Sequence, residues 1–299
     1  MSVGLTLPAL PSAEITVSEF LGQAREAEEV GVASVWIAQL PLGQDALAVA
    51  ALVGQVTSRV EIGTSVVPIY PRHPVVLAAA ARTASEASGG RFTLGVGLGA
   101  KDFHEPLYGV PYPPPVRHLR EYLTVLRGVF AGEQVDYAGS TVEAHLTEPA
   151  PKTAISVLVA AMGPQALRVT GELADGSLPY LAGPRALETV VVPALEGKRV
   201  VAAVPAVVTN DVDAVRDAAA AELAFYGTLP SYRRILDAGG VDRPEELALI
   251  GDEETVAAGV QRYFDAGATD VLLAQTALHT DEDRRRTWRL AGQLNSSGS

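Results

Sequence analysis

The chain has 299 residues, of which 48% are hydrophobic and 19% charged, a composition that supports a large core and argues against disorder. Its net charge of −12, from 35 acidic and 23 basic residues, argues against sequence-independent nucleic-acid binding and against an anionic membrane surface. The absence of cysteine excludes disulfides, thiolate nucleophiles and thiolate metal sites. No signal peptide and no apolar run of the roughly 20 residues that span a membrane is recognisable, so we expect a cytoplasmic protein.

Apolar runs alternate with helical patterns along the first third of the chain, which predicts a series of strand–helix units. The strands of this part are predicted at residues 3–7, 34–38, 60–67 and 92–98. The helices between them are predicted at 16–30, 45–57 with Asp45 as the cap, and 74–87. A stretch rich in proline and tyrosine at 103–117 then interrupts the alternation. Pro113–Pro115 with Tyr108 and Tyr112 are candidates to cover a site, with a packed surface loop as the alternative.

A helix at 116–131 and a small hairpin at 135–142 follow this stretch, and the alternation then resumes. Further strands are predicted at 156–161, 177–181, 200–208 and 270–275, and further helices at 164–174, 185–195 and 284–294. A long helical region, broken near 227–230 and 239–240, separates the last two strands. Eight units predict an α/β fold, a single (β/α)8 TIM barrel domain over residues 1–299, with insertions after strand 4 and between strands 7 and 8. A doubly wound open sheet is the alternative, and about 295–299 is expected to be a disordered tail.

Active sites of such barrels lie at the C-terminal ends of the strands. After the fifth strand, Ala161, Met162, Gly163, Pro164 and Gln165 lead into a helix. Proline suits the first helical turn, and the free amides of that turn point outward at the positive end of the helix dipole. The segment therefore predicts a phosphate or carboxylate site, with an ordinary strand-to-helix turn as the alternative.

Polar residues and glycines also follow strands three and four. Arg72 is a candidate partner for a ligand carboxylate or phosphate, and His73 is a candidate acid or base, with a structural hydrogen bond as its alternative. Gly97 and Gly99 do not match the spacing of a dinucleotide fingerprint, and we interpret them as room for a flat ring beside the backbone. His104 lies beyond strand four, where a solvated loop is the alternative interpretation.

Signatures of other enzyme classes are missing from the sequence. The five histidines show no HxxxH or HxH spacing, so no metal site is predicted. There is no GxSxG elbow and no phosphate-binding GxxxxGK[ST] loop, which argues against esterase and P-loop functions.

Several motifs occur in a characteristic order: EEVGVASVW at 28–36, IGTSVV at 62–67, RHP at 72–74, SGGRFTLGVG at 88–97, ADG at 174–176 and GATD at 267–270. Together they resemble the bacterial luciferase-like family of flavin- and deazaflavin-dependent oxidoreductases, over residues 3 to about 273. The resemblance implies a (β/α)8 barrel with a non-proline cis peptide at the end of strand three, which corresponds to Ser65–Val66 here and backs the cofactor ring. It also implies a cofactor phosphate site at 161–166 and a homodimer.

Within the family, the short chain is most similar to actinobacterial enzymes assigned to the deazaflavin coenzyme F420, with FMN as the alternative cofactor. The resemblance implies an anionic cofactor tail near Arg72, Lys101 and Arg117. The residues expected to bind the cofactor are Gln39, Thr64, Ser65, Val66, Arg72, Gly97, Gly99, Ala161, Met162, Gly163, Pro164 and Gln165.

One position departs from the family pattern. Several F420-dependent relatives have an acidic residue and a histidine after strand two, where this chain has Gln39 and Leu40, and neither can act as a general acid. This argues against a sugar-phosphate dehydrogenase and leaves water, His73, His104 or a tyrosine as the source of a proton. The leading hypothesis is an F420-dependent oxidoreductase that transfers a hydride between the deazaflavin and a small organic substrate. The alternatives are an FMN-dependent monooxygenase, which uses reduced flavin and oxygen, and a non-catalytic flavin-binding barrel.

Overall fold

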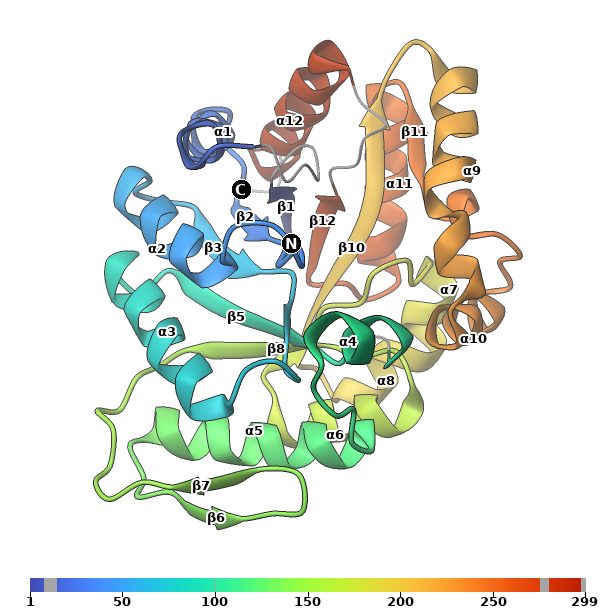
Figure 1. Ribbon diagram of the computed structural model, residues 1–299. Helices are drawn as coiled ribbons and strands as arrows, with labels where there is room; N and C mark the ends of the chain where they lie inside the picture. The colour runs from blue at the N-terminus through green and yellow to red at the C-terminus, as the bar shows by residue number, and fades with distance from the viewer. Residues whose placement is uncertain (8–14, 100, 275–279, 297–299) are drawn as a thin grey trace.

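The strands close into a parallel barrel surrounded by helices (Figure 1). The computed structural model describes residues 1–7, 15–99, 101–274 and 280–296, except for the side chains of residues 102–104. Within this part of the chain, the order around the barrel is β1, β2, β3 with β4, β5, β8, β9, β10 and β12, and β12 pairs in parallel with β1. The predicted (β/α)8 barrel is confirmed, and the open-sheet alternative is wrong. No helix in the described ranges is long and apolar enough to cross a membrane.

The strands are β1 (Ser2–Leu7), β2 (Ser34–Ile37), β3 (Glu61–Thr64), β4 (Val67–Pro68), β5 (Phe92–Gly97), β6 (Asp136–Ala138), β7 (Glu143–His145), β8 (Ser156–Ala160), β9 (Gly176–Ser177), β10 (Arg199–Val208), β11 (Leu249–Gly251) and β12 (Asp270–Ala274). The helices are α1 (Val17–Glu29), α2 (Ala46–Val56), α3 (Pro74–Ala87), α4 (Lys101–Tyr108), α5 (Pro115–Ala131), α6 (Pro164–Leu173), α7 (Pro184–Ala186), the π-helix η1 (Leu187–Val191), α8 (Val192–Leu195), α9 (Val212–Thr228), α10 (Pro230–Gly239), the 3-10 helix η2 (Pro244–Leu247), α11 (Glu253–Asp265) and α12 (Asp281–Ser296).

The strands read as continuous apolar runs because parallel strands in a barrel are buried on both faces. All six residues of β5 are buried. Side chains on the inner face of the barrel strands fill the barrel, where a cluster around Trp36 packs together. Side chains on the outer face of these strands pack against the helices. As predicted, Asp45 caps α2, since its carboxylate accepts hydrogen bonds from the amides of Leu47 and Ala48 at 3.0 and 3.1 Å.

Several predicted boundaries need correction. The third predicted strand is divided into β3 and β4, and the cis peptide bond between them joins Ser65 and Val66, as predicted. The sixth strand is short, and beyond it Tyr180 forms an isolated bridge with Ala203 of β10. The second strand of the hairpin, β7, begins beyond the predicted range of 135–142, because its turn is longer than the Ala-Gly-Ser segment. The predicted strand residue Gln275 lies outside the described residues.

The C-terminal segment is also more ordered than predicted. We expected a disordered tail at about 295–299, but Asn295 and Ser296 belong to α12. The Asn295 side chain accepts a hydrogen bond from the Val3 amide at 2.8 Å and donates to the Val3 and Gly31 carbonyls at 2.9 and 3.2 Å. These bonds fasten α12 to β1, and residues 297–299 lie outside the described part.

An ion-pair network joins the N-terminal ends of four strands at the bottom of the barrel. Arg199 of β10 donates two hydrogen bonds to Glu61 of β3, at 2.6 and 2.8 Å, and two to Asp270 of β12, both at 2.9 Å. Ser2 of β1 donates to Asp270 at 2.5 Å. The guanidinium lies 5.8 Å from the centre of the Trp36 ring, so the network covers the apolar interior of the barrel at this end.

Glu121 attaches the β6–β7 hairpin to α5. Its buried carboxylate accepts hydrogen bonds from the amides of Ser140, Thr141 and Val142 and from the hydroxyls of Ser140 and Thr141. Burial opposes ionisation, but these hydrogen bonds outweigh it and lower the pKa of Glu121 to about 2.

This depressed pKa predicts a pH dependence of stability. Because the folded pKa lies below the ordinary value of 4.5, the stabilisation is present above pH 4.5 and is lost as the pH falls toward 2. We expect Glu121→Gln to lower the free energy of unfolding by about 1–2 kcal/mol at pH 7 and to flatten its decline between pH 4.5 and 2. Urea unfolding at several pH values measures both, with Glu86→Gln, an exposed position on α3, as the control. Equal pH profiles for the wild type and Glu121→Gln would contradict this role.

Candidate functional site

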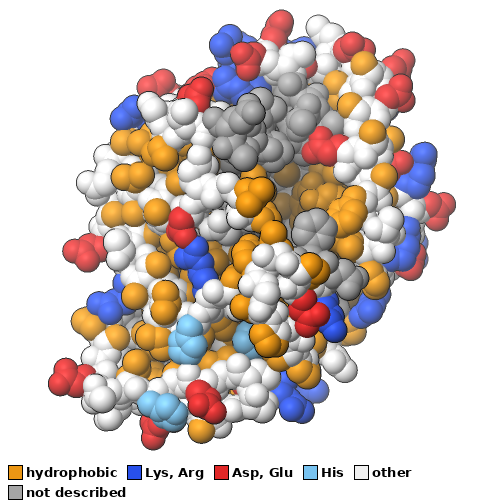
Figure 2. Space-filling model, viewed as in Figure 1, with side chains coloured by type: hydrophobic (Ala, Val, Ile, Leu, Met, Phe, Trp, Pro, Cys, Tyr) orange, Lys and Arg blue, Asp and Glu red, His pale blue; other side chains and the backbone are white. Residues whose placement is uncertain are grey.

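A cavity of about 800 Å³ opens at the C-terminal ends of the strands. Figure 2 shows hydrophobic side chains around a hollow in this face of the molecule. Its walls come from the segments that follow β2, β5 and β8, from α4, and from α9 and α10. The residues that line it are Gln39, Pro41, Val66, Pro68, Gly97, Leu98, Gly99, Leu107, Tyr108, Tyr112, Pro115, Val116, Ala160, Ala161, Met162, Gly163, Pro164, Gln165, Ala166, Pro179, Tyr180, Phe225, Tyr226, Leu229, Ser231, Tyr232 and Arg234.

Small and branched apolar residues form the surface contributed by the barrel: Val66, Gly97 and Ala160. A Cβ atom on Gly97 would lie 2.5 Å from Cγ2 of Val66, and one on Gly95 would lie 1.9 Å from the carbonyl oxygen of Thr64. These glycines are therefore required for the close packing of β5 against the β3–β4 segment. The resulting surface is apolar and carries few side-chain atoms, which suits a flat ligand. The interpretation that Gly97 and Gly99 leave room for a flat ring stays a prediction.

The first turn of α6 forms a polar end of the cavity. Pro164 is the first residue of this helix, Gly163 is its N-cap, and no side chain caps it. The amides of Gln165 and Ala166 have no carbonyl one turn earlier in the helix, so they are available to an anion at the positive end of the dipole. The predicted segment 161–165 therefore lines the cavity with the chemistry of an anion site.

Arg234 of α10 adds a positive charge at this end. A Cβ atom placed on Gly163 would lie 3.6 Å from Arg234 Nη1, so the guanidinium reaches the first turn of α6. In the described part of the chain, Arg234 forms no ion pair, and its side chain is exposed to the cavity. A guanidinium beside free helix amides is a favourable arrangement for a phosphate.

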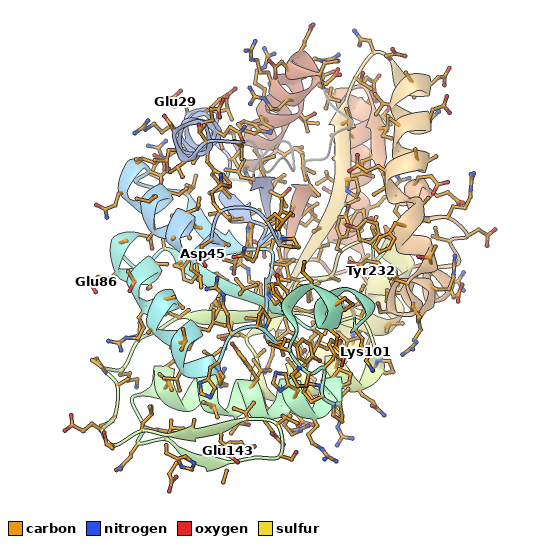
Figure 3. The ribbon with its side chains drawn as sticks, viewed as in Figure 1. Glu29, Asp45, Glu86, Lys101, Glu143 and Tyr232 are labelled. Carbon is orange, nitrogen blue, oxygen red and sulfur yellow. The ribbon has the colours of Figure 1, made fainter. Side chains whose placement is uncertain are left out.

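Three tyrosines form an aromatic wall: Tyr180 from the segment after β9, Tyr226 of α9 and Tyr232 of α10. Figure 3 shows Tyr232 on the side of α10 that faces the barrel. The rings of Tyr226 and Tyr232 meet edge to face, with centroids 4.8 Å apart. Burial raises the pKa of each of the three hydroxyls, with a smaller contribution from neighbouring groups. The hydroxyls are therefore neutral near pH 7.

Another aromatic stack supports the α4 side of the cavity. Tyr112, which lines the cavity, stacks on Tyr70 with centroids 4.0 Å apart, and Tyr70 stacks on His118 at 4.8 Å. The Tyr112 hydroxyl donates a hydrogen bond to the Gly99 carbonyl at 3.0 Å. The stretch at 103–117 thus contributes to the cavity through Leu107, Tyr108, Tyr112, Pro115 and Val116, three of which were candidates to cover a site.

Four of the residues predicted to bind the cofactor directly or to act in catalysis do not line the cavity. Thr64 is fully buried, and its hydroxyl bonds the amide and the carbonyl of Gly95, so it fastens β3 to β5. Ser65 donates its amide to the Ile37 carbonyl and is also outside the lining. Arg72 forms an ion pair with Asp45, the cap of α2.

The fourth is His73, predicted as a catalytic acid or base. It is exposed and caps α3, where its Nδ1 accepts a hydrogen bond from the Val75 amide at 3.3 Å, and its Nε2 lies 2.7 Å from the Glu143 carbonyl. Both nitrogens thus bind backbone outside the cavity, and the structural alternative describes His73 better. His104, the other predicted catalytic residue, belongs to α4, and its side chain lies outside those that the structure describes.

Gln39, which is predicted to bind the cofactor, lines the cavity, but its side-chain amide forms hydrogen bonds with the backbone of its own loop and of α2. Its Nε2 donates to the Leu40 carbonyl at 3.0 Å, and its Oε1 accepts from the Ala46 amide at 2.9 Å. Lys101 and Arg117, expected near an anionic tail, are exposed and do not line the cavity. Among the described residues there is no group of three or more His, Asp or Glu side chains placed to hold a metal ion.

Sequence reasoning missed Arg234, Tyr226 and Tyr232. All three belong to the helical region between the seventh and eighth barrel strands, which was predicted only as a broken helical segment. The only signal was the spacing of Phe225, Tyr226 and Tyr232 around the break at 227–230, and this spacing does not tell which side of the helices faces the barrel.

Comparisons with known proteins identify relatives of this chain. A coenzyme F420-dependent oxidoreductase of Mycobacterium tuberculosis, named so provisionally, is 33% identical over 174 residues, which cover 53% of this chain and 50% of the relative. The chain thus aligns with about half the length of that relative. The 5,10-methylenetetrahydromethanopterin reductase of Methanolobus tindarius is 28% identical over 238 residues, 76% of this chain and 72% of the enzyme.

A solved structure, the coenzyme F420-dependent tetrahydromethanopterin reductase from Methanopyrus kandleri, has the same fold. It superimposes with a TM-score of 0.81 at 23% identity and covers 98% of this chain and 97% of its own. The family model described as luciferase-like monooxygenase matches residues 1–270. The resemblance of the sequence motifs is confirmed, and the chain belongs to the luciferase-like monooxygenase family.

Proposed function

We propose that this protein is an F420-dependent oxidoreductase that transfers a hydride between the deazaflavin and a small organic substrate. The observation that carries the proposal is a single cavity that combines an anion site, made by the α6 amides and Arg234, with an apolar surface from the barrel. The mycobacterial relative and the Methanopyrus structure, which are both named for coenzyme F420, support the choice of cofactor.

The residues of the cavity suit the chemical parts of this cofactor. Its phosphodiester matches the free amides of Gln165 and Ala166 and the guanidinium of Arg234. Its flat ring matches the apolar surface of Val66 and Gly97.

When bound, the deazaflavin supplies or accepts the hydride, and the protein provides orientation and a dry environment. The apolar walls exclude water from the reacting groups, which strengthens every polar interaction there. The neutral tyrosine hydroxyls are hydrogen-bond donors for a substrate oxygen, and they replace the acid–histidine pair that this chain lacks at Gln39 and Leu40.

Titration of the purified protein with F420 and with FMN, in parallel, tests the proposal. We expect F420 to bind with a dissociation constant in the micromolar range or lower and FMN to bind more weakly. Tighter binding of FMN, with oxygen consumption when reduced flavin is supplied, would favour a monooxygenase. Binding of neither cofactor would refute the proposal and leave the non-catalytic barrel.

The expected homodimer and the cytoplasmic location stay predictions. Analytical ultracentrifugation tests the homodimer.

A further inference from the structure

The aromatic wall of the cavity consists of three tyrosines in contact with one another. The centroids of Tyr180 and Tyr226 are 5.3 Å apart with the rings at 71°, and those of Tyr180 and Tyr232 are 6.4 Å apart at 83°. Each ring edge therefore points toward a neighbouring ring face, a favourable arrangement that holds the rings in place. Leu229 and Phe225 extend the same wall, and Phe225 is 47% exposed.

The three hydroxyls are available to a ligand. Within the part of the chain that the structure describes, none of Tyr180, Tyr226 and Tyr232 forms a hydrogen bond through its hydroxyl. A ligand that displaces solvent from the wall loses free energy if it leaves such a hydroxyl without an acceptor. The wall thus favours a ligand with an acceptor oxygen in addition to apolar surface.

Charge restricts the ligand further. Among the described lining residues, Arg234 is the one charged side chain, and it lies at the α6 end. None of the lining residues that the structure describes is a carboxylate that could pair with an organic cation. Glu222 of α9 acts electrostatically on Tyr180 and Tyr226, so its negative charge disfavours an anion at the tyrosine wall.

We propose that the tyrosine wall binds an uncharged organic molecule that has an apolar ring or chain and a carbonyl or hydroxyl oxygen. The oxygen accepts a hydrogen bond from Tyr226 or Tyr232, and the apolar part packs against the rings and Leu229. This inference rests on the proposed function, because it assigns the α6 end of the same cavity to the cofactor phosphate.

Three probes of similar size separate the contributions of the hydrogen bond, of apolar packing and of charge to binding. They are acetophenone, which has a carbonyl, ethylbenzene, which has none, and benzoate, which is anionic. Saturation-transfer NMR titrations give their dissociation constants for the wild type, Tyr226→Phe, Tyr232→Phe and the double variant. Tyr137→Phe, on the β6–β7 hairpin outside the cavity, is the matched control. Circular dichroism establishes that each variant is folded.

We expect acetophenone to bind the wild type more tightly than benzoate. Each single variant should weaken acetophenone binding about 3- to 10-fold, and the double variant should weaken it more, while ethylbenzene binding and Tyr137→Phe change less than about twofold. Tighter binding of benzoate, or equal effects of the variants on acetophenone and ethylbenzene, would overturn the inference.

The same samples are titrated with F420. If the tyrosine variants do not weaken acetophenone binding selectively while F420 still binds, the proposed substrate class is refuted and the proposed function is not. If the variants weaken acetophenone binding selectively but F420 does not bind, the proposed function is refuted and the inferred ligand chemistry of the tyrosine wall stands.

Discussion

Replacing Arg234 with glutamine is expected to weaken the binding of F420 about 10- to 50-fold. The guanidinium lies beside the first turn of α6, where a cofactor phosphate would meet both the helix amides and a full positive charge. A hydrogen bond to a charged group contributes about 1.5–3 kcal/mol, and glutamine retains a donor but no charge. Fluorescence titration measures the affinity, and the difference between wild type and variant should shrink as salt screens the charge.

The matched control is Arg168→Gln. Arg168 is on α6 itself, pairs with Glu172 and is exposed outside the cavity, so this variant changes the net charge by the same amount. We expect its F420 affinity to stay within twofold of the wild type. If both variants weaken binding equally, the effect is one of overall charge and Arg234 has no special role.

Replacing Arg199 with glutamine is expected to lower the free energy of unfolding by about 3–5 kcal/mol. The substitution leaves Glu61 and Asp270 together at the bottom of the barrel without their shared cation, and unpaired carboxylates in a half-buried site are strongly destabilising. Arg199→Lys keeps the charge but cannot donate to both carboxylates in the same fork, so we expect a smaller loss. Urea unfolding measures each value.

The pH dependence distinguishes this network from simple packing. Burial opposes ionisation of Asp270, but its hydrogen bonds with Arg199 and its neighbours lower the pKa, so the stabilisation is present near neutral pH and is lost in acid. The difference between the wild type and Arg199→Gln should therefore shrink as the pH falls. Arg25→Gln, at an exposed position of α1, is the control. An effect of Arg199→Gln no larger than that of the control would refute the role of the network.

The fold could be predicted from the sequence because each barrel strand is a short apolar run, buried on both faces, next to a helix. The same logic located the part of the cavity that the strand ends form. Residues at the ends of parallel strands meet at one end of a barrel, so the position of Gly97, Gly99 and the segment 161–165 at or just after a strand end predicts that they lie there.

The rest of the site depends on orientations that adjacency to a strand does not determine. Arg72 and His73 follow β4 closely, yet the start of α3 turns them toward Asp45 and the β6–β7 hairpin. Arg234 and Tyr232 are distant from any strand end, and they reach the cavity because α10 folds back over the barrel. Such tertiary placement is not encoded in local periodicity.

The length of β10 has a consequence for how this protein can change. Its first half belongs to the barrel, whereas its last residues pair with β11 and pack, with α9 and α10, around a second small core of Leu181, Val207, Val215, Ala219, Leu223, Leu236, Leu247 and Ile250. The three wall tyrosines pack against this second core, and α9 and α10 carry Tyr226, Tyr232 and Arg234, while the apolar surface and the α6 amides belong to the barrel. Exchange of residues 210–248 for the corresponding segment of a relative is therefore a route by which evolution, or a designer, can change what the enzyme accepts while the barrel and its folding are retained.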